Sequence, residues 1–181
     1  MTEPIALEPA QAAIVRSLTT DACQDMFQTL GSPVTLLEKL EGPAHDIAAF
    51  IGFTGSARGM LMIASSMELF RSSYPSKTGT PPSVVGLFDW AAEVANQLLG
   101  RIKRRFCERG LDFDVSMPTA VRGRELGGRA PARDGACNLA FTIGDQGICV
   151  SLEVAPPDNG RIFKDPAEPI GCAIEGDLVL F

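Results

Sequence analysis

The sequence predicts a two-layer α/β protein in which two long helices pack on a mostly antiparallel sheet. Two segments, about residues 9–30 and 83–110, have apolar side chains at helical spacing. A strand-like run follows each helix, and then come two further runs joined by a short Gly-containing turn, as in a β-hairpin. This order of elements occurs twice, which indicates an internal duplication and favours a layer of helices on a sheet.

The first half begins with the helix at 9–30, and we expect this helix to be terminated by Gly31 and Pro33. Its apolar positions are Ala10, Ile14, Leu18, Ala22, Met26 and Leu30. Strand-like runs follow at 33–41, 45–55 and 57–66. The link GFTGSARG between the last two lacks the Gly-Lys-Ser/Thr of a phosphate-binding loop and leads into no helix, so we interpret it as a hairpin turn.

The second half follows a short helix at 66–74 and a turn-rich connector at 75–83. The apolar stripe of its long helix is Phe88, Ala91, Ala95, Leu98, Leu99, Ile102 and Phe106. After this helix we predict a strand in 111–123, a polar Gly/Arg loop over 122–135 and a hairpin made of 136–145 and 146–155. Residues 1–155 then form a single domain. Residues 156–181 are a Pro- and Gly-rich tail of the same domain, which we expect at the surface with DLVLF as a candidate final strand.

Composition excludes several classes of function. A chain of 181 residues with a net charge of −6 and no long basic run is a poor candidate for binding nucleic acid or an anionic membrane. The N-terminus lacks the pattern of a signal peptide, and no apolar run reaches the ~18 residues of a membrane span. Five scattered cysteines without a CxxC pair indicate reduced thiols and a cytoplasmic protein.

The single histidine, His45, excludes two kinds of site. A Cys/His zinc cluster cannot be built from one histidine and widely spaced cysteines, so we expect no metal ligands in this chain. A Ser-His-Asp triad would need His45, and nothing near it resembles a nucleophile elbow. We interpret His45 as a surface or hairpin residue.

The long helix carries a polar line opposite its apolar stripe. Asp89, Glu93, Asn96 and Gly100 follow one another at spacings of four, three and four residues, and Lys103 extends the line. Any amphipathic helix has a solvated face, which is the simplest interpretation. Gly100 favours a contact with another molecule over a merely solvated face, because a mid-helix glycine costs about 1 kcal/mol of helix stability relative to alanine. A missing side chain at the surface lets the backbone of another molecule come close.

The segment DWAAEVAN, followed by Pro118 in the next strand, resembles the signature of the CheC/CheX/FliY family of chemotaxis phosphatases. That signature has Asp or Ser, Glu four residues later, Asn three residues after that, and a distant Pro. The hairpins IGFTGSARGMLMIASS and FTIGDQGICVSLEV are also similar to those of the family, so the resemblance covers roughly residues 10–155. It implies a CheC-like sandwich fold.

The resemblance also implies a function. Family members remove the aspartyl phosphate of a CheY-like response regulator. Glu93 would form a salt bridge with a receiver lysine, and Asn96 would orient the attacking water. Asp89, Gly100, Lys103 and Pro118 would contact the partner. The chain would need no cofactor of its own, because Mg²⁺ is expected on the receiver domain.

A second copy of the signature could lie in the first helix, as Asp21, Asp25 and Gln28 with Pro33 after them. We interpret it as degenerate, because the side-chain lengths differ and the proline comes too early. A single site is the pattern of the CheX branch, whose members form dimers, and a sheet edge is a ready pairing surface. A non-catalytic adaptor or flagellar-switch-like component, and more remotely a small-ligand sensor, stay open as alternatives.

Overall fold

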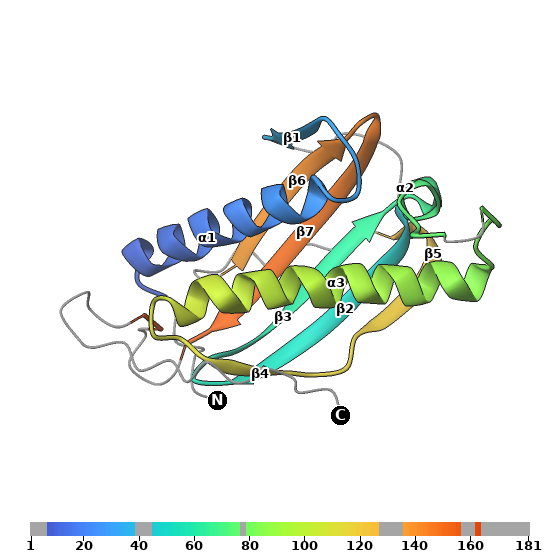
Figure 1. The fold of residues 1–181 in the computed structure, drawn as a ribbon. Helices are drawn as coiled ribbons and strands as arrows, with labels where there is room; N and C mark the ends of the chain where they lie inside the picture. The colour runs from blue at the N-terminus through green and yellow to red at the C-terminus, as the bar shows by residue number, and fades with distance from the viewer. Residues whose placement is uncertain (1–6, 39–44, 77–78, 127–135, 157–161, 164–181) are drawn as a thin grey trace, which may run out of the picture.

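Among the described residues, seven strands form one sheet, and both long helices lie on the same face of it (Figure 1). The computed structural model describes residues 7–38, 45–76, 79–126, 136–156 and 162–163. The elements are α1 (Pro9–Phe27), β1 (Val34–Leu37), β2 (His45–Gly55), β3 (Arg58–Ser65), α2 (Met67–Ser72), α3 (Val84–Cys107), β4 (Phe113–Val115), β5 (Thr119–Leu126), β6 (Ala136–Ile143) and β7 (Gln146–Ala155). All strand pairs in this part of the chain are antiparallel, so the predicted fold class is confirmed.

The order of the strands supports the predicted duplication. The sheet runs β1-β6-β7-β3-β2, and β4 and β5 both pair with β2 at the far edge. If each element is exchanged for its counterpart in the other half, β1 with β4/β5, β2 with β6 and β3 with β7, the same order is obtained in reverse. Each half therefore gives its first strand to the other half's hairpin, which makes the two halves one sheet.

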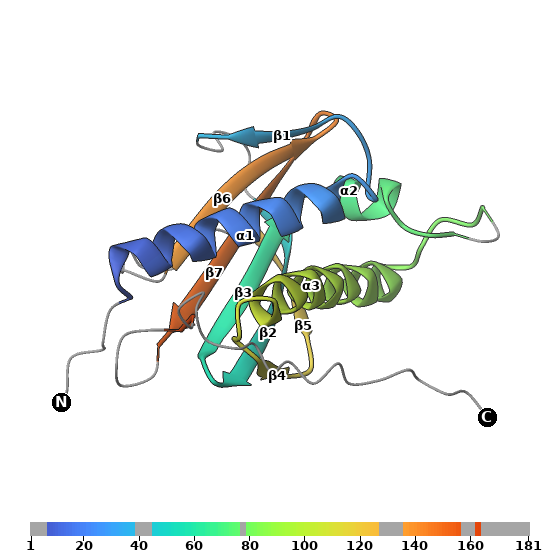
Figure 2. The ribbon, with the colours of Figure 1, turned by 60° about the vertical axis from the view of Figure 1, so that its left-hand side comes forward.

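The core lies between the sheet and the two long helices. α3 packs mainly on β2, and α1 packs on β6 and against α3, so the helices cover adjoining parts of one sheet face (Figure 2). Along β2 the fully buried Ile47, Ala49 and Ile51 alternate with residues of the opposite face, as a strand with one face in the core requires. On the other side of the core, Phe27 at the end of α1 meets Phe141 of β6 edge to face, with ring centroids 5.2 Å apart.

The Gly/Arg-rich stretch differs from the prediction. Residues 122–126 belong to β5, which pairs with β2 from His45↔Leu126 to Phe50↔Thr119, so the predicted loop over 122–135 is wrong for its first five residues. The single strand predicted at 111–123 is two strands, interrupted at 116–118. Pairing with the long strand β2 outweighs the weak local strand propensity of this sequence. Residues 127–135 lie outside the described residues.

The C-terminal tail also differs in part. We expected it at the surface, but Ile162 and Phe163 are buried, and the Phe163 ring meets that of Phe106 in α3 at 5.3 Å. The buried side chain of Gln11 holds this segment. Its Oε1 accepts the backbone N–H groups of Ile162 and Phe163 at 3.0 and 2.9 Å, and its Nε2 donates to the Phe163 carbonyl at 3.4 Å. The end of the tail, with DLVLF and Cys172, lies outside the described residues.

Other predicted boundaries hold within a few residues. The first helix ends at Phe27 rather than Leu30, and the chain then turns through Gly31 and the cis Ser32–Pro33 peptide bond. The first predicted strand is described to Leu37, and its last part, 39–41, lies outside the described residues. No helix in the described ranges is long and apolar enough to cross a membrane.

Candidate functional site on helix α3

Helix α3 is a rigid, well-terminated element. Ser83 caps its N-terminus by accepting the Gly86 N–H at 3.1 Å. Arg104 and Arg105 lie in its last turn, where cations favour the helix dipole. Gly110, with a φ of 78°, then allows the reversal in which the Leu111 N–H reaches back to the Phe106 carbonyl at 3.0 Å. Side chains on this helix are therefore held by an ordered backbone.

The polar line predicted on α3 faces solvent. Asp89, Glu93, Asn96 and Gly100 are all exposed. The opposite face is buried in the core through Leu87, Ala91, Val94, Ala95, Leu98, Leu99, Ile102 and Phe106. The predicted buried stripe is thus correct except at Phe88, which is only partly buried, and Leu87 and Val94 belong to it as well.

Glu93 and Asn96 differ in how they are held. The Glu93 carboxylate accepts a hydrogen bond from Gln97 Nε2 at 2.7 Å, an i,i+4 contact that limits its rotamers. No hydrogen bond holds the Asn96 amide within the described part of the chain, so its donor and acceptor are available to another molecule. The sequence analysis did not single out Gln97, although it follows Glu93 by four residues, a spacing at which side chains on a helix contact each other.

Gly100 lies in open space. A Cβ added there would meet no atom within 4 Å, so no packing within the chain requires a glycine at this position. The glycine accordingly costs helix stability without a compensating internal contact. This is the property expected of a surface that another backbone approaches.

Lys103 differs from the other residues of the line because its side chain contacts residues outside α3. Its Nζ lies 3.2 Å from Asp112 Oδ1 and 5.8 Å from the centroid of the Phe113 ring. The hydrogen bond from Lys103 is the main reason that the pKa of Asp112 is lowered from its usual value. Lys103 therefore ties the end of α3 to β4, and any contact with a partner would have to compete with Asp112.

Pro118 lies in the interruption between β4 and β5 and is partly exposed. Ser116 fixes this interruption to β2, because its N–H donates to the Gly52 carbonyl at 2.9 Å and its hydroxyl accepts the Gly52 N–H at 3.0 Å. Met117, between Ser116 and Pro118 in the sequence, is 89% exposed. β5, which follows directly, packs against α3.

The N-terminal half of α3 is fixed by the chain's single tryptophan. Trp90 Nε1 donates to Ser73 Oγ just after α2 at 3.1 Å, and its ring meets Tyr74 edge to face at 6.3 Å. Trp90 precedes Glu93 by less than one turn. Its fluorescence is therefore a natural reporter for events on the polar line.

The possible second copy in α1 has a different geometry. Asp21, Asp25 and Gln28 are exposed, but Asp25 forms an ion pair with Arg105 of α3. Gln28 is the C-cap residue and lies outside the helix. A carboxylate engaged within the chain and an amide beyond the last helical turn do not reproduce the arrangement of Glu93 and Asn96, which favours the interpretation of this copy as degenerate.

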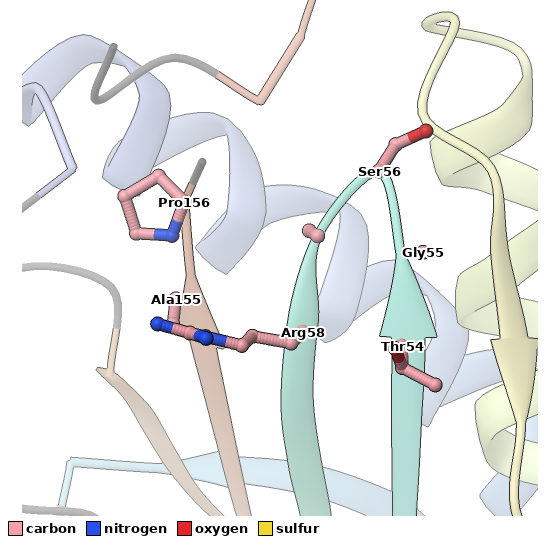
Figure 3. Close-up of a pocket in the computed structure, with 7 residues that line it drawn as sticks. Thr54, Gly55, Ser56, Arg58, Ala155 and Pro156 are labelled. Atoms are coloured by element: carbon pink, nitrogen blue, oxygen red, sulfur yellow. The ribbon is translucent and has the colours of Figure 1, made fainter. Parts of the chain in front are cut away.

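The hairpin GFTGSARG forms the predicted turn between β2 and β3. A hollow of about 290 Å³ lies beside it, and Arg58 extends there from the hairpin toward Ala155 (Figure 3). The hollow is lined by Thr54, Gly55, Ser56, Ala57, Arg58, Ala155 and Pro156, and thus by no residue of α3. It is not part of the predicted site.

Other titratable groups do not suggest an additional site. His45 is partly buried at the first residue of β2, and this burial lowers its pKa from the usual value of 6.5. Burial also raises the pKa of the Cys137 thiol to about 11. Cys23 and Cys137 are buried free thiols. No group of three or more His, Cys, Asp or Glu side chains in the described ranges could hold a metal ion. The polar groups that α3 exposes on the predicted line include the Glu93 carboxylate and the Asn96 amide.

Comparison with known protein families gives a match over the middle of the chain. The family described as chemotaxis phosphatase CheX matches residues 47–142, which is 96 of the 181 residues and includes the whole of α3. Comparison with curated protein sequences gives no match.

Solved structures show the same fold at low sequence identity. The chemotaxis protein CheX from Vibrio vulnificus is 19% identical with a TM-score of 0.65, and the match covers 78% of this chain and 99% of that one. CheX from Borrelia burgdorferi, in a complex with CheY, BeF3 and Mg²⁺, is 16% identical with a TM-score of 0.54, over 80% and 97% of the two chains. FliY from Thermotoga maritima is 12% identical with a TM-score of 0.54, over 82% and 92%.

Proposed function

Since this chain belongs to the CheX family of chemotaxis phosphatases, we propose that it hydrolyses the aspartyl phosphate of a CheY-like response regulator in the cytoplasm. The observation that carries the proposal is the Asn96 amide, exposed on a rigid helix, unbonded within the described residues and one turn from the Glu93 carboxylate. The structural neighbour from Borrelia burgdorferi is bound to CheY, which supports a receiver domain as the partner.

In the proposed mechanism the protein supplies geometry rather than a nucleophile. Glu93 pairs with a lysine of the receiver domain, and Asn96 enters the receiver's site and orients a water in line with the phosphorus–aspartate bond. The water oxygen bonds to phosphorus as the P–O bond to the aspartate breaks. The products are inorganic phosphate and a free carboxylate. Mg²⁺ on the receiver neutralises the phosphoryl oxygens, so this chain needs no metal of its own.

The remaining residues of the line form the contact around this pair. We assign Asp89 and Gly100 to the docking surface on α3, because both are exposed on the same line. Pro118, next to the exposed Met117, extends it at the edge of the sheet. Lys103 reaches the partner only if it exchanges Asp112 for a receiver carboxylate.

We also propose a homodimer formed at a sheet edge. Within the described residues, the eight-residue strand β5 pairs with β2 on one side only, and its outer side offers unpaired backbone groups. Sedimentation of the purified protein over a range of concentrations tests this. A dimer supports the proposal, and a monomer at all concentrations contradicts it.

The experiment that tests the phosphatase proposal is a dephosphorylation time course. Purified phosphorylated receiver domains from the same genome are followed with Mg²⁺, with and without this protein. Faster loss of phosphate from at least one receiver supports the proposal. Binding to a receiver without faster loss would contradict it and support the non-catalytic adaptor instead.

A further inference from the structure

Charge is distributed unevenly along the exposed face of α3. Its N-terminal half presents the carboxylates of Asp89 and Glu93, whereas its C-terminal end contains Arg101, Lys103, Arg104 and Arg105. The chain as a whole has a net charge of −6, so the local charge at this end of α3 is opposite in sign to the net charge of the protein. The two halves meet at Asn96 and Gly100, neither of which carries a charge.

Three of these four cations are engaged within the chain. Arg101 Nη1 donates to the Gln97 carbonyl at 3.3 Å, and Lys103 Nζ lies 3.2 Å from Asp112. Arg105 forms its ion pair with Asp25 of α1. These contacts explain why basic residues occupy those positions.

Arg104 is the exception. Its side chain is exposed, and no carboxylate in the described part of the chain pairs with it, not even Glu108 one turn further on. The helix dipole favours a cation in the last turn but is worth only about 0.3–1 kcal/mol, and Arg105 already supplies one.

Arg104 also lies on the line that contains the proposed active pair. Eleven residues are just over three whole turns, so Arg104 and Glu93 point in nearly the same direction. Gly100 lies between them, four residues before Arg104, and leaves the helix surface bare there. Along the helix axis, Arg104 is about 12 Å from Asn96.

We propose that Arg104 is a docking residue that binds a carboxylate on the surface of the same receiver domain whose phosphate Asn96 addresses. This inference rests on the proposed function. The carboxylates at one end of α3 and the guanidinium at the other require opposite charges on the partner, so only one orientation along the helix satisfies both. Arg104 contributes to recognition and orientation, and it takes no part in the chemical step.

The test compares Arg104→Glu with a matched control, Arg58→Glu. Both replace an exposed arginine and change the net charge equally, but Arg58 begins β3 and lines the hollow beside the β2–β3 hairpin, to which no residue of α3 contributes. Association with a beryllofluoride-activated receiver is followed through Trp90 fluorescence, and phosphate release is measured with the variants at saturation. Thermal unfolding confirms that both variants fold.

The expected result is a slower association for Arg104→Glu, by about tenfold at about 50 mM salt and by less than twofold at about 500 mM. Its dephosphorylation rate at saturation should equal that of the native protein, and Arg58→Glu should match the native protein in both assays. A receiver in which the contacted carboxylate is replaced by lysine should associate fast with Arg104→Glu. The same receiver variant should not associate fast with the native protein.

Two results would overturn the inference alone. One is equal association of Arg104→Glu and Arg58→Glu while the native protein still removes phosphate. The other is a lower rate of Arg104→Glu at saturation with unchanged association, which would give Arg104 a role in the chemical step. A native protein that neither binds nor dephosphorylates any receiver would refute the proposed function itself, and the inference with it.

Discussion

The substitution Gly100→Ala should make the protein more stable and at the same time a weaker partner for the receiver domain. The position is inside α3 and exposed, and an added Cβ meets no atom within 4 Å, so the substitution introduces no clash. Alanine is better than glycine in a helix interior by about 1 kcal/mol. For a chain of this size that gain raises the melting temperature by about 2–4 °C.

The loss of binding has a separate origin. If the receiver backbone packs directly on the bare helix surface, a methyl group there overpacks the interface by about 1–3 kcal/mol, which is roughly a 5- to 150-fold increase in Kd. Thermal unfolding gives the first quantity, and titration of a beryllofluoride-activated receiver, followed through Trp90, gives the second.

Gly86→Ala is the matched control, because Gly86 belongs to the same helix and its Cβ would make only ordinary contacts, the closest to Ser83 Oγ at 3.5 Å. Gly86 lies two turns before Glu93 at the start of the same line, beyond Asp89, so its substitution should lower receiver affinity less than Gly100→Ala does. If Gly100→Ala binds as tightly as the native protein, the glycine does not mark a contact with another backbone. If it lowers the melting temperature, the open space inferred around Gly100 is wrong.

Two further predictions concern single side chains. Glu93→Gln should raise the Kd for the receiver about tenfold while the rate at saturation stays within threefold, because Glu93 is exposed and bonds only Gln97 within the described residues; an unchanged Kd would refute its role as the partner of a receiver lysine. His45→Gln should flatten the pH dependence of stability below about pH 6.5. Burial lowers the pKa of His45, so the unfolded chain takes up a proton at a higher pH than the folded one. Native stability is therefore full above about pH 6.5 and falls as the pH drops from there through the lowered pKa. His45 is the only histidine, and an equal fall in the variant, measured by urea unfolding, would assign the effect to other groups.

Periodicity and turn residues were sufficient to predict most of the fold. The hairpin β6–β7 turns at Gly144, whose φ of 62° is what a glycine at that turn permits. The polar line on α3 could be predicted because a 24-residue helix with a regular apolar stripe leaves little freedom in which residues face outward. Both features depend on short-range patterns, which a single sequence contains.

Features that depend on distant segments could not be predicted in this way. The last part of β5, residues 122–126, has the composition of a polar Gly/Arg loop but forms a strand because it pairs with β2. Gln11 looks like a surface residue of α1, but it is buried because it holds the backbone at Ile162 and Phe163. The spacing of Lys103 continues the polar line, but its ammonium group forms an ion pair with Asp112, the residue before β4. In each of these three cases the structure depends on a contact with a residue of another segment of the chain, which local periodicity does not reveal.

The most direct test of the central proposal is the dephosphorylation rate of the receiver at saturating concentrations of native protein and of Asn96→Ala. Asn96 is exposed and has no hydrogen-bond partner within the described residues, and alanine suits a helix better, so the variant should be at least as stable as the native protein. Removing one group that positions the reacting atoms should lower the rate about 100-fold, or about 2.7 kcal/mol, with little change in Kd. A saturated rate within threefold of the native one would contradict the assignment of Asn96 as the residue that orients the attacking water.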